Sequence, residues 1–465
     1  MRRLARRGLA VGLALALGAA AAQEAAAQTR VALEAGSGYV VPRAILGANM
    51  IYTVETDRVR RMAADGAPAA SEAEGALMRA ARGAGLGYLR FPGGTAAQNF
   101  NWITNGPLAS HEDALSRGLV LTPRNLWRFS GERRLDALMD TVEFVRFARA
   151  AGAEPALIVN LEGPFHSPEA PIEGLAGRGA TGLTCEMPRD PVGCYVKLAA
   201  EWVHEINVVR GLRVRDWDLG NESFGIGNRH SFTAREYAAL VPRFSRAMKA
   251  VDPSIRIGVI GPWEARGHAF ADRLTPEGRA RFRALTHQAR RTLLRDGRRR
   301  GLNLRGIARE LNGGRDVGEP ARWWPVLLSE AAGHYDYAAL HRLSDYGRSL
   351  GPNAHDLSRP VTIGDALDAF ARMSSRATGA PVPVSLNAWS TIPANAGNED
   401  RLDALGAYLT TLELLGQIAE ARVDSAAVWP FSHAVSKGLV RLRGSPGQGF
   451  RASSGLMRPP YEDFS

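Results

Sequence analysis

Cysteine is scarce in this chain. Its 465 residues include only two cysteines, Cys185 and Cys194, and no pair of histidines lies near them. Such a set makes a poor zinc site. We therefore expect a protein that needs no metal and no other cofactor.

Long apolar runs are also lacking beyond the N-terminus, so no later stretch is suited to span a membrane. Residues 1–28 combine a basic start, a short apolar run and two Ala-Ala-Ala stretches, as a secretory signal peptide does. We expect a periplasmic or secreted mature chain. In an oxidising compartment Cys185 and Cys194 should form a disulfide. Two buried free thiols are the alternative.

Lysine is almost absent, and the basic residues are nearly all arginine. The formal net charge is +11, and removing residues 1–28 takes away four arginines and Glu24, which leaves +8. A basic surface favours anionic polymers, such as acidic polysaccharides or nucleic acid. No nucleic-acid motif accompanies the charge, so we expect no nucleic-acid partner. Residues 266–324 read as an arginine-rich helical insertion with a solvated face, or alternatively as a clamp for acidic glycans.

A strand-then-helix rhythm runs through the chain and indicates the fold. Eight apolar stretches are suited to buried parallel strands. They cover residues 44–50, 88–94, 155–160, 217–222, 255–261, 335–341, 382–387 and 425–431. Eight such strands with crossover helices predict an α/β protein with a (β/α)8 TIM barrel. A doubly wound open sheet is the alternative, but no glycine-rich phosphate loop follows the first strand.

The remaining segments define the expected domain boundaries. Residues 29–43 are expected to form an accessory strand, 44–435 the barrel, and 436–465 C-terminal strands. Together the terminal strands would make a small, incomplete accessory β region. Residues 162–191, rich in glycine and proline, are a second insertion.

The fourth expected strand ends in Trp217-Asp218-Leu219-Gly220-Asn221-Glu222. Its end places a carboxylate at the carboxyl edge of the barrel, where active sites of this fold lie. This stretch resembles the acid/base strand of the retaining clan-A glycoside hydrolases, closest to the α-L-arabinofuranosidase-like family. The resemblance implies that Glu222 is the general acid/base and that Asn221 binds a sugar hydroxyl. A Glu that caps the following helix is the alternative.

Other strands carry further parts of the resemblance. Arg90-Phe91-Pro92-Gly93-Gly94, and Asn101-Trp102 followed by Gly106-Pro107, are similar to two family signatures. They imply that Arg90 shapes the sugar site and that Trp102 stacks on a sugar, unless Trp102 is a core aromatic. Asn160 and His341 end the third and sixth strands, where residues of the family bind substrate.

The seventh strand departs from the family pattern. The family nucleophile lies in a Glu-aromatic-Asn-x-Trp sequence, and here Ser385-Leu386-Asn387-Ala388-Trp389 takes its place. Asn387 and Trp389 match as substrate-binding positions, but Ser385 stands at the nucleophile-equivalent position. A hydroxyl without its own base is a poor replacement for a carboxylate. Glu162 and Glu264 follow other strand ends and are candidates for the second carboxylate.

Two functions from different classes follow from these observations. The first is an exported glycoside hydrolase that acts on a polysaccharide or oligosaccharide, with carbohydrate, acidic or neutral, as its partner. The second is a catalytically silent barrel that binds glycan or supports surface-polysaccharide assembly. A polysaccharide lyase would need a His or Tyr base, and His341 permits it without selecting it.

Overall fold

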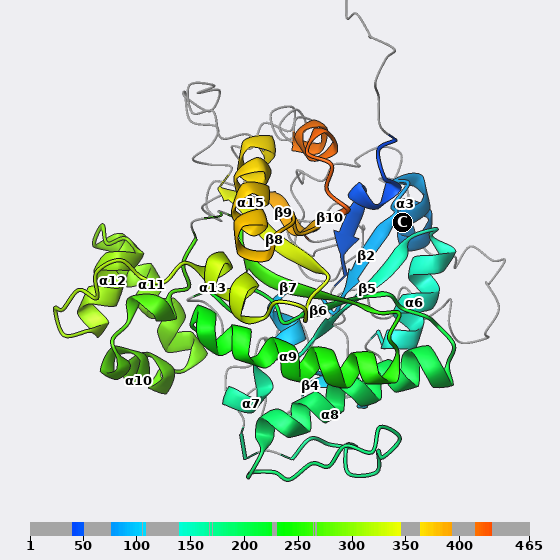
Figure 1. Ribbon diagram of the computed structural model, residues 1–465, viewed down its shortest axis with the longest axis horizontal. Helices are drawn as coiled ribbons and strands as arrows, with labels where there is room; N and C mark the ends of the chain where they lie inside the picture. Colours follow the sequence, from blue (N-terminus) through cyan, green and yellow to red (C-terminus); the bar gives the residue numbers. More distant parts are fainter. Residues whose placement is uncertain are drawn as a thin grey trace, which may run out of the picture. The chain divides into compact units, whose positions relative to one another are not determined.

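The computed structural model describes residues 40–50, 76–104, 106–107, 139–166, 168–169, 171–225, 230–263, 265, 267–345, 363–392 and 414–429. Within them lies a closed barrel of eight parallel strands (Figure 1). Around the barrel the strands follow the order β1-β10-β9-β8-β7-β6-β5-β2. Their bounds are β1 Gly47–Asn49, β2 Tyr88–Phe91, β5 Glu154–Val159, β6 Asp216–Leu219, β7 Arg256–Pro262, β8 Tyr337–Asp345, β9 Val384–Ile392 and β10 Ser425–Val428. All eight expected strands are confirmed, and so is the (β/α)8 class.

Helices cover the outside of the barrel. Those that follow strands are α3 Ala76–Gly83, α6 Thr141–Ala150, α8 Pro191–Val203, α9 Ala234–Val251, α13 Trp323–Glu330 and α15 Ile363–Thr378. Two of them begin with a capping box: Asp140 with Glu143 in α6, and Thr233 with Glu236 in α9. Reciprocal bonds of this kind satisfy backbone N–H groups that a helix start leaves without partners. None of the helices in the described ranges is long and apolar enough to cross a membrane.

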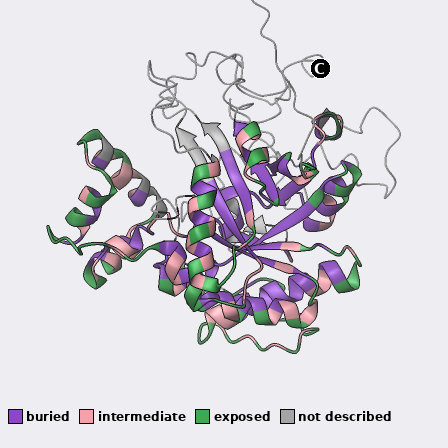
Figure 2. Ribbon diagram, turned by 45° about the horizontal axis from the view of Figure 1, so that its top comes forward, coloured by how far each residue is buried: buried purple, intermediate pink, exposed green. Residues whose placement is uncertain are grey.

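The main apolar core lies between the strands and these helices. Figure 2 shows the barrel strands buried along their length, whereas the helices are buried mainly on one side. Trp217 of β6, fully buried, meets Trp202 of α8 edge to face at 5.4 Å between ring centroids. Alternate residues of each strand therefore face the helices, and the residues between them face the inside of the barrel.

Both expected insertions are present. Residues 162–191 include the short helix α7 (Gly163–His166), and residues 267–322 include α10 (Pro276–Ala284), α11 (His287–Arg299) and α12 (Leu304–Leu311). We call residues 267–322 the arginine lobe. A second apolar cluster, which includes Phe282 and Ile307, holds its helices together. Because the lobe follows β7, it begins at the carboxyl edge of the barrel.

The chain ends agree only partly with the expected boundaries. Residues 1–39 and 430–465 lie outside the described residues, and with them the predicted signal peptide and C-terminal strands. Of the predicted accessory strand, residues 40–42 are described and form no strand. Residues 43–45 form a 3-10 helix, η1 (Arg43–Ile45), so the first barrel strand begins later than expected, at Gly47.

Candidate active site

A carboxylate inside the barrel organises the base of the site. Asp218 of β6 accepts hydrogen bonds from Arg90 Nε of β2 (2.5 Å), Asn387 Nδ2 of β9 (2.6 Å) and Tyr337 OH of β8 (2.8 Å). Neither β2 nor β9 neighbours β6 in the barrel. These bonds therefore cross the barrel interior. Asp218 and Arg90 are both fully buried, and together they form a buried ion pair.

Arg90 connects this buried pair to the end of β6. Its Nη1 donates to Asn49 Oδ1 at 3.0 Å and to Asn221 Oδ1 at 3.3 Å. Asn49, the last residue of β1, in turn donates to the Asn387 carbonyl oxygen at 2.8 Å. Among the described residues the buried Nη2 of Arg90 has no hydrogen-bond partner. The guanidinium thus fixes the Asn221 side chain and keeps one donor available.

Glu222 follows Asn221 in a left-handed backbone conformation, with φ at 51°. Its side chain is 29% exposed, and its Oε1 lies 3.1 Å from His341 Nδ1 of β8. Burial raises the pKa of Glu222, but the hydrogen bond and charge of His341 and the charge of Arg90 outweigh it, and the net shift is downward. A proton donor needs a pKa that its surroundings raise towards the working pH. In this structure the opposite direction prevails, because His341 and Arg90 favour the carboxylate.

His341 is the partner that tunes Glu222. Burial lowers the pKa of His341 more than its hydrogen bond to Glu222 raises it, and the net shift favours the neutral imidazole. A carboxylate only accepts hydrogen bonds, so Nδ1 must carry the proton that bridges the pair. The buried Nε2, which has no partner among the described residues, is then an acceptor. A ligand hydroxyl could donate to it.

Glu162 lies close to the same strand end. It follows β5, is fully buried, and accepts from Gln98 Nε2 at 2.8 Å and from the His230 backbone N–H at 3.1 Å. Gln98 also donates to the Asn221 carbonyl oxygen at 2.6 Å. The second candidate carboxylate, Glu264, lies outside the described residues.

Asn160 and Trp102 are both engaged with the protein itself. Asn160 Oδ1 accepts from the Gly163 N–H at 3.0 Å, at the start of α7. The Trp102 indole donates to the Leu198 carbonyl oxygen at 2.9 Å and stacks on Trp202 at 6.4 Å between ring centroids. Trp102 is only 9% exposed. These contacts are those of a core aromatic, and sugar stacking by Trp102 stays a prediction.

Ser385 lies near the beginning of β9 rather than at its carboxyl end. It pairs in register with Ala339 and is hydrogen-bonded to Ser425 Oγ at 2.5 Å and to Asn387 Oδ1. His341, which holds Glu222, pairs instead with Ala388. The position that we expected across from Glu222 is therefore deeper in the barrel than the Glu222–His341 pair.

A β-bulge follows Ser385 in β9. The register of β9 shifts by one residue against β8 between Ser385 and Ala388, and against β10 between Leu386 and Trp389. Leu386 and Trp389 both belong to the core cluster outside the strands. Asn387 and Ala388 between them therefore share the inner side. The Trp389 indole N–H is buried without a partner among the described residues.

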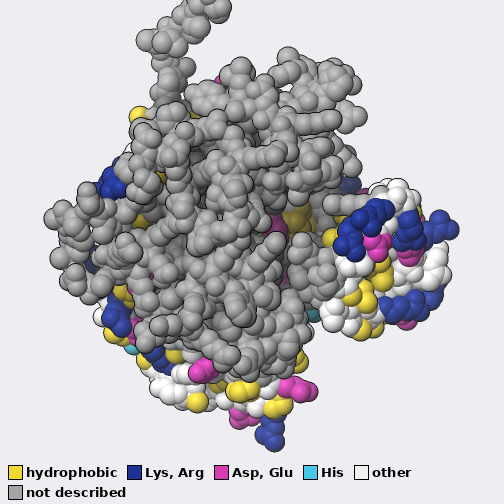
Figure 3. Space-filling model, turned by 180° about the vertical axis from the view of Figure 1, so that it is seen from behind, with side chains coloured by type: hydrophobic (Ala, Val, Ile, Leu, Met, Phe, Trp, Pro, Cys, Tyr) yellow, Lys and Arg dark blue, Asp and Glu magenta, His cyan; other side chains and the backbone are white. Residues whose placement is uncertain are grey.

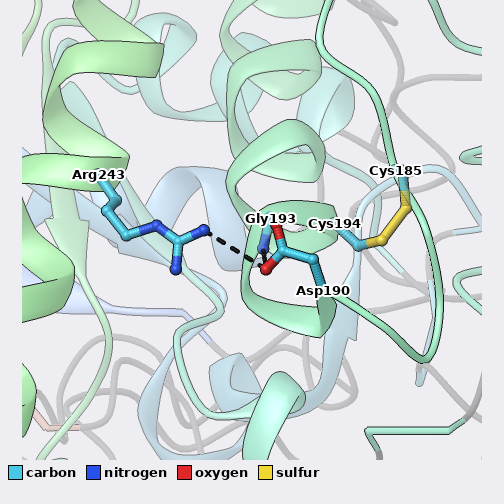
Figure 4. Close-up of a disulfide and its surroundings, with 5 residues drawn as sticks. All are labelled: Cys185, Asp190, Gly193, Cys194 and Arg243. Carbon is cyan, nitrogen blue, oxygen red and sulfur yellow. Dashed lines mark hydrogen bonds and ion pairs between the residues drawn. A yellow bond between two sulfur atoms is a disulfide. The ribbon is translucent and has the colours of Figure 1, made fainter.

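The expected disulfide is confirmed. Cys185, in the first insertion, is bonded to Cys194 in the first turn of α8 (Figure 4). Asp190 Oδ1 caps the same turn by accepting from the Gly193 N–H at 2.9 Å. The same oxygen lies 3.5 Å from Nη2 of Arg243 in α9. The disulfide thus ties the first insertion to the start of a helix that packs on the barrel.

Four site residues were missed by the sequence reasoning: Asn49, Gln98, Asp218 and Tyr337. A signal existed for two of them. Asn49 and Asp218 are polar residues within apolar strands, and buried polar groups are found where they have partners. Gln98 lies in the 3-10 helix η2 (Gly94–Asn99), and nothing in its local sequence distinguished it. In the described ranges no cluster of three His, Cys, Asp or Glu side chains could hold a metal ion.

Comparison with known proteins supplies the remaining information. No family model matches the chain. It is 28% identical over 189 residues to an intracellular exo-α-(1→5)-L-arabinofuranosidase of Halalkalibacterium halodurans, which covers 40% of this chain and 32% of that protein. A protein of the same description from Streptomyces lividans is 28% identical over 200 residues, 42% of this chain and 26% of that one. The match thus spans about a third or less of these curated relatives.

Solved structures show a weaker likeness. A family 51 α-L-arabinofuranosidase from Bifidobacterium longum matches at 16% identity with a TM-score of 0.48, over 84% of this chain and 67% of that one. The arabinofuranosidase from Thermotoga maritima matches at 16% identity with a TM-score of 0.46, over 84% and 64%. Over about two fifths of its length the chain is therefore similar in sequence to curated arabinofuranosidases.

Proposed function

We propose that the protein is a glycoside hydrolase that acts on α-L-arabinofuranosyl groups of a polysaccharide or oligosaccharide, with Glu222 as the general acid/base. One observation carries the proposal: Glu222 stands at the carboxyl end of β6, bonded to His341, beside an Asn221 that Arg90 holds. The curated relatives are described as arabinofuranosidases, which supports the same class of substrate.

The geometry suggests how this chain would prepare a glycosidic bond for cleavage. Glu222 must take up a proton before it can give one to the leaving oxygen. A ligand hydroxyl that donates to His341 Nε2 would leave the Nδ1–H bond to Glu222 in place. We expect sugar hydroxyls to meet Arg90 Nη2, which has no partner among the described residues, and the side-chain amide of Asn221. Asn160 and Asn387 already bond to Gly163 and Asp218, and their roles in sugar binding stay predictions. The substrate-binding roles of Trp102 and Trp389 stay predictions, because both side chains belong to the apolar core.

The proposed hydrolysis depends on which residue supplies the second carboxylate. Glycosidases of both stereochemical outcomes use two carboxyl groups, about 5–5.5 Å apart for retention and about 6.5–9.5 Å apart for inversion. The sequence of β9 contains neither Asp nor Glu. Glu162 and Glu264 remain the candidates. This same observation favours the alternative function, a silent barrel that binds glycan or supports surface-polysaccharide assembly.

An acidic glycan is the form of substrate that the charge distribution favours. The arginine lobe holds fourteen arginines against six acidic residues. Figure 3 shows basic side chains, which in this lobe are all arginine, gathered on its surface. Ion pairs such as Arg300–Glu310 and Arg305–Asp316 neutralise part of the charge, and the excess stays positive. A lobe that begins at the carboxyl edge of the barrel could hold uronate-bearing chains near the site.

Export is the last element of the proposal. The disulfide supports it, because disulfides persist in oxidising compartments. Fractionation of cells that produce the full chain, with a blot for the processed form, would test export directly.

The deciding experiment is a screen of the mature protein on aryl glycosides, including the α-L-arabinofuranoside, and on neutral and acidic polysaccharides. Glu222→Gln keeps the shape of the side chain but cannot donate a proton. Because general-acid catalysis is worth about 10²–10⁴-fold, we expect turnover to fall by that factor while folding is retained. Binding of a polysaccharide without turnover by either protein would favour the silent barrel. Activity of Glu222→Gln within a few-fold of wild type would show that another residue is the acid.

A further inference from the structure

Glu162 is a buried carboxylate whose two oxygens serve two different segments. Oε1 accepts from the Gln98 side chain at 2.8 Å, and Oε2 accepts from the His230 backbone N–H at 3.1 Å. The residue is 0% exposed. Both oxygens thus have donors within the protein, and no part of the side chain faces solvent.

Both of these partners connect Glu162 to the backbone around Glu222. Gln98 Nε2 also donates to the carbonyl oxygen of Asn221 at 2.6 Å, which is the peptide group directly before Glu222. On the other side, two residues after His230, the Phe232 N–H donates to the Ser223 carbonyl oxygen at 2.9 Å. Residues 221–225 and 230–232 are therefore held from two sides by one carboxylate.

The backbone at Glu222 needs such support. A φ of 51° is a left-handed conformation that favours glycine, and surrounding contacts must maintain it in a residue with a side chain. The arginine lobe contributes to the same place. Burial lowers the pKa of Arg290 to about 10, and the negative charge of Glu162 acts in the opposite direction. Arg290 of α11 is thus close enough to sense Glu162 electrostatically.

We propose that Glu162 is a positioning residue, which fixes the backbone that carries Glu222 through Gln98 and His230, rather than the second catalytic carboxylate. Each oxygen of this fully buried carboxylate already accepts a hydrogen bond from a segment next to Glu222, which favours positioning over attack on a sugar. The effect on turnover rests on the proposed function, but the effect on the backbone does not.

Glu162→Gln tests the proposal by hydrogen exchange. A glutamine offers one acceptor oxygen where Glu162 offers two, and its amide nitrogen would face a donor. One of the two segments must therefore lose its bond. We expect amide exchange in residues 221–225 or 230–232 to rise at least about 10-fold, while exchange within α9 stays unchanged. Unchanged exchange in both segments would overturn the proposal.

A matched control and a second variant separate positioning from general destabilisation. Glu201 of α8 is also buried and accepts from Thr181 N at 3.1 Å and Thr181 Oγ1 at 2.7 Å. Glu201→Gln should leave exchange around Glu222 unchanged. Gln98→Met keeps Glu162 and its bond from His230, so amide exchange should rise in residues 221–225 alone. An equal rise of amide exchange in both segments in Glu201→Gln would contradict the assignment.

Kinetic measurements give a further test of the role of Glu162 if wild-type protein hydrolyses an aryl glycoside. A misplaced Glu222 should lower kcat by about 10²-fold in Glu162→Gln with little change in KM. Added azide should not restore turnover, because no nucleophile has been removed. Azide rescue with formation of a glycosyl azide would identify Glu162 as a catalytic carboxylate and overturn the proposal. If wild-type protein hydrolyses nothing, the proposed function fails, and the exchange measurement still decides the role of Glu162.

Discussion

The ion pair inside the barrel makes a prediction that can be worked out from its geometry. In Asp218→Asn the amide keeps the size of the side chain. Its oxygen can still accept from Arg90 and Asn387, and its NH₂ can donate to Tyr337 if that hydroxyl rotates. Hydrogen bonding is thereby largely preserved. What the substitution removes is the negative charge beside a guanidinium that is 0% exposed.

A guanidinium cannot lose its proton inside a protein, so Arg90 would stay charged without a counter-ion. Breaking a buried pair by removing one partner costs about 3–5 kcal/mol. We expect the free energy of unfolding of Asp218→Asn to fall by that amount in urea denaturation followed by tryptophan fluorescence. Adding Arg90→Met to Asp218→Asn should recover part of the loss, because the unpaired charge is then gone.

The same strand offers a matched control. Burial raises the pKa of Asp216 to about 6, above its ordinary value, in spite of Arg256, whose Nε lies 3.7 Å away. The folded protein therefore favours the protonated form, and this group's contribution to stability falls as pH rises from about 4 to about 6. Asp216→Asn should be neutral or stabilising at pH 7. A loss below about 1 kcal/mol in Asp218→Asn, or an equal loss in both variants, would refute the reasoning.

Two predictions concern the mouth of the barrel. His341→Leu removes the hydrogen bond that lowers the pKa of Glu222, so burial should raise that pKa. The alkaline limb of the kcat/KM profile should then move to higher pH. An alkaline limb that stays in place would mean that Glu222 is not the titrating acid. Ala388→Glu places a carboxylate beside His341, whereas Ser385→Glu buries one next to Ser425. We therefore expect a mechanism-based fluoro-sugar to form an adduct with Ala388→Glu alone, and we expect Ser385→Glu to be less stable than wild type. An adduct on wild type or on Ser385→Glu would show that position 388 is not where the second carboxylate acts.

The sequence predicted the barrel because most of its eight strands are nearly continuous apolar runs. A strand covered by helices outside and by side chains inside needs such a run, as residues 155–160 show. Glu222 and Asn221 could be located because strand ends are defined by where the apolar run stops. Long-range partners could not be located, since nothing in the local sequence of Gln98 indicates that it bonds to Asn221 and Glu162.

The register of β9 was beyond sequence reasoning for a different reason. A strand motif is read on the assumption that side chains alternate strictly, and the bulge breaks that alternation between Leu386 and Trp389. The direction of the Glu222 pKa shift was missed for a related reason. It depends on His341, which is distant in sequence and meets Glu222 only through the closed barrel.

The bulge in β9 also bears on how this barrel can change over time. In a regular strand, a new inward side chain must replace an existing one, because neighbouring positions face opposite sides. In β9 two consecutive positions, Asn387 and Ala388, share the inner side, and only Asn387 is committed to the bond with Asp218. Ala388 is thus a spare position, at which mutation could introduce new chemistry without dismantling the ion-paired interior. Deleting one residue here would restore strict alternation and turn the Trp389 ring into a barrel already filled by Arg90 and Asp218.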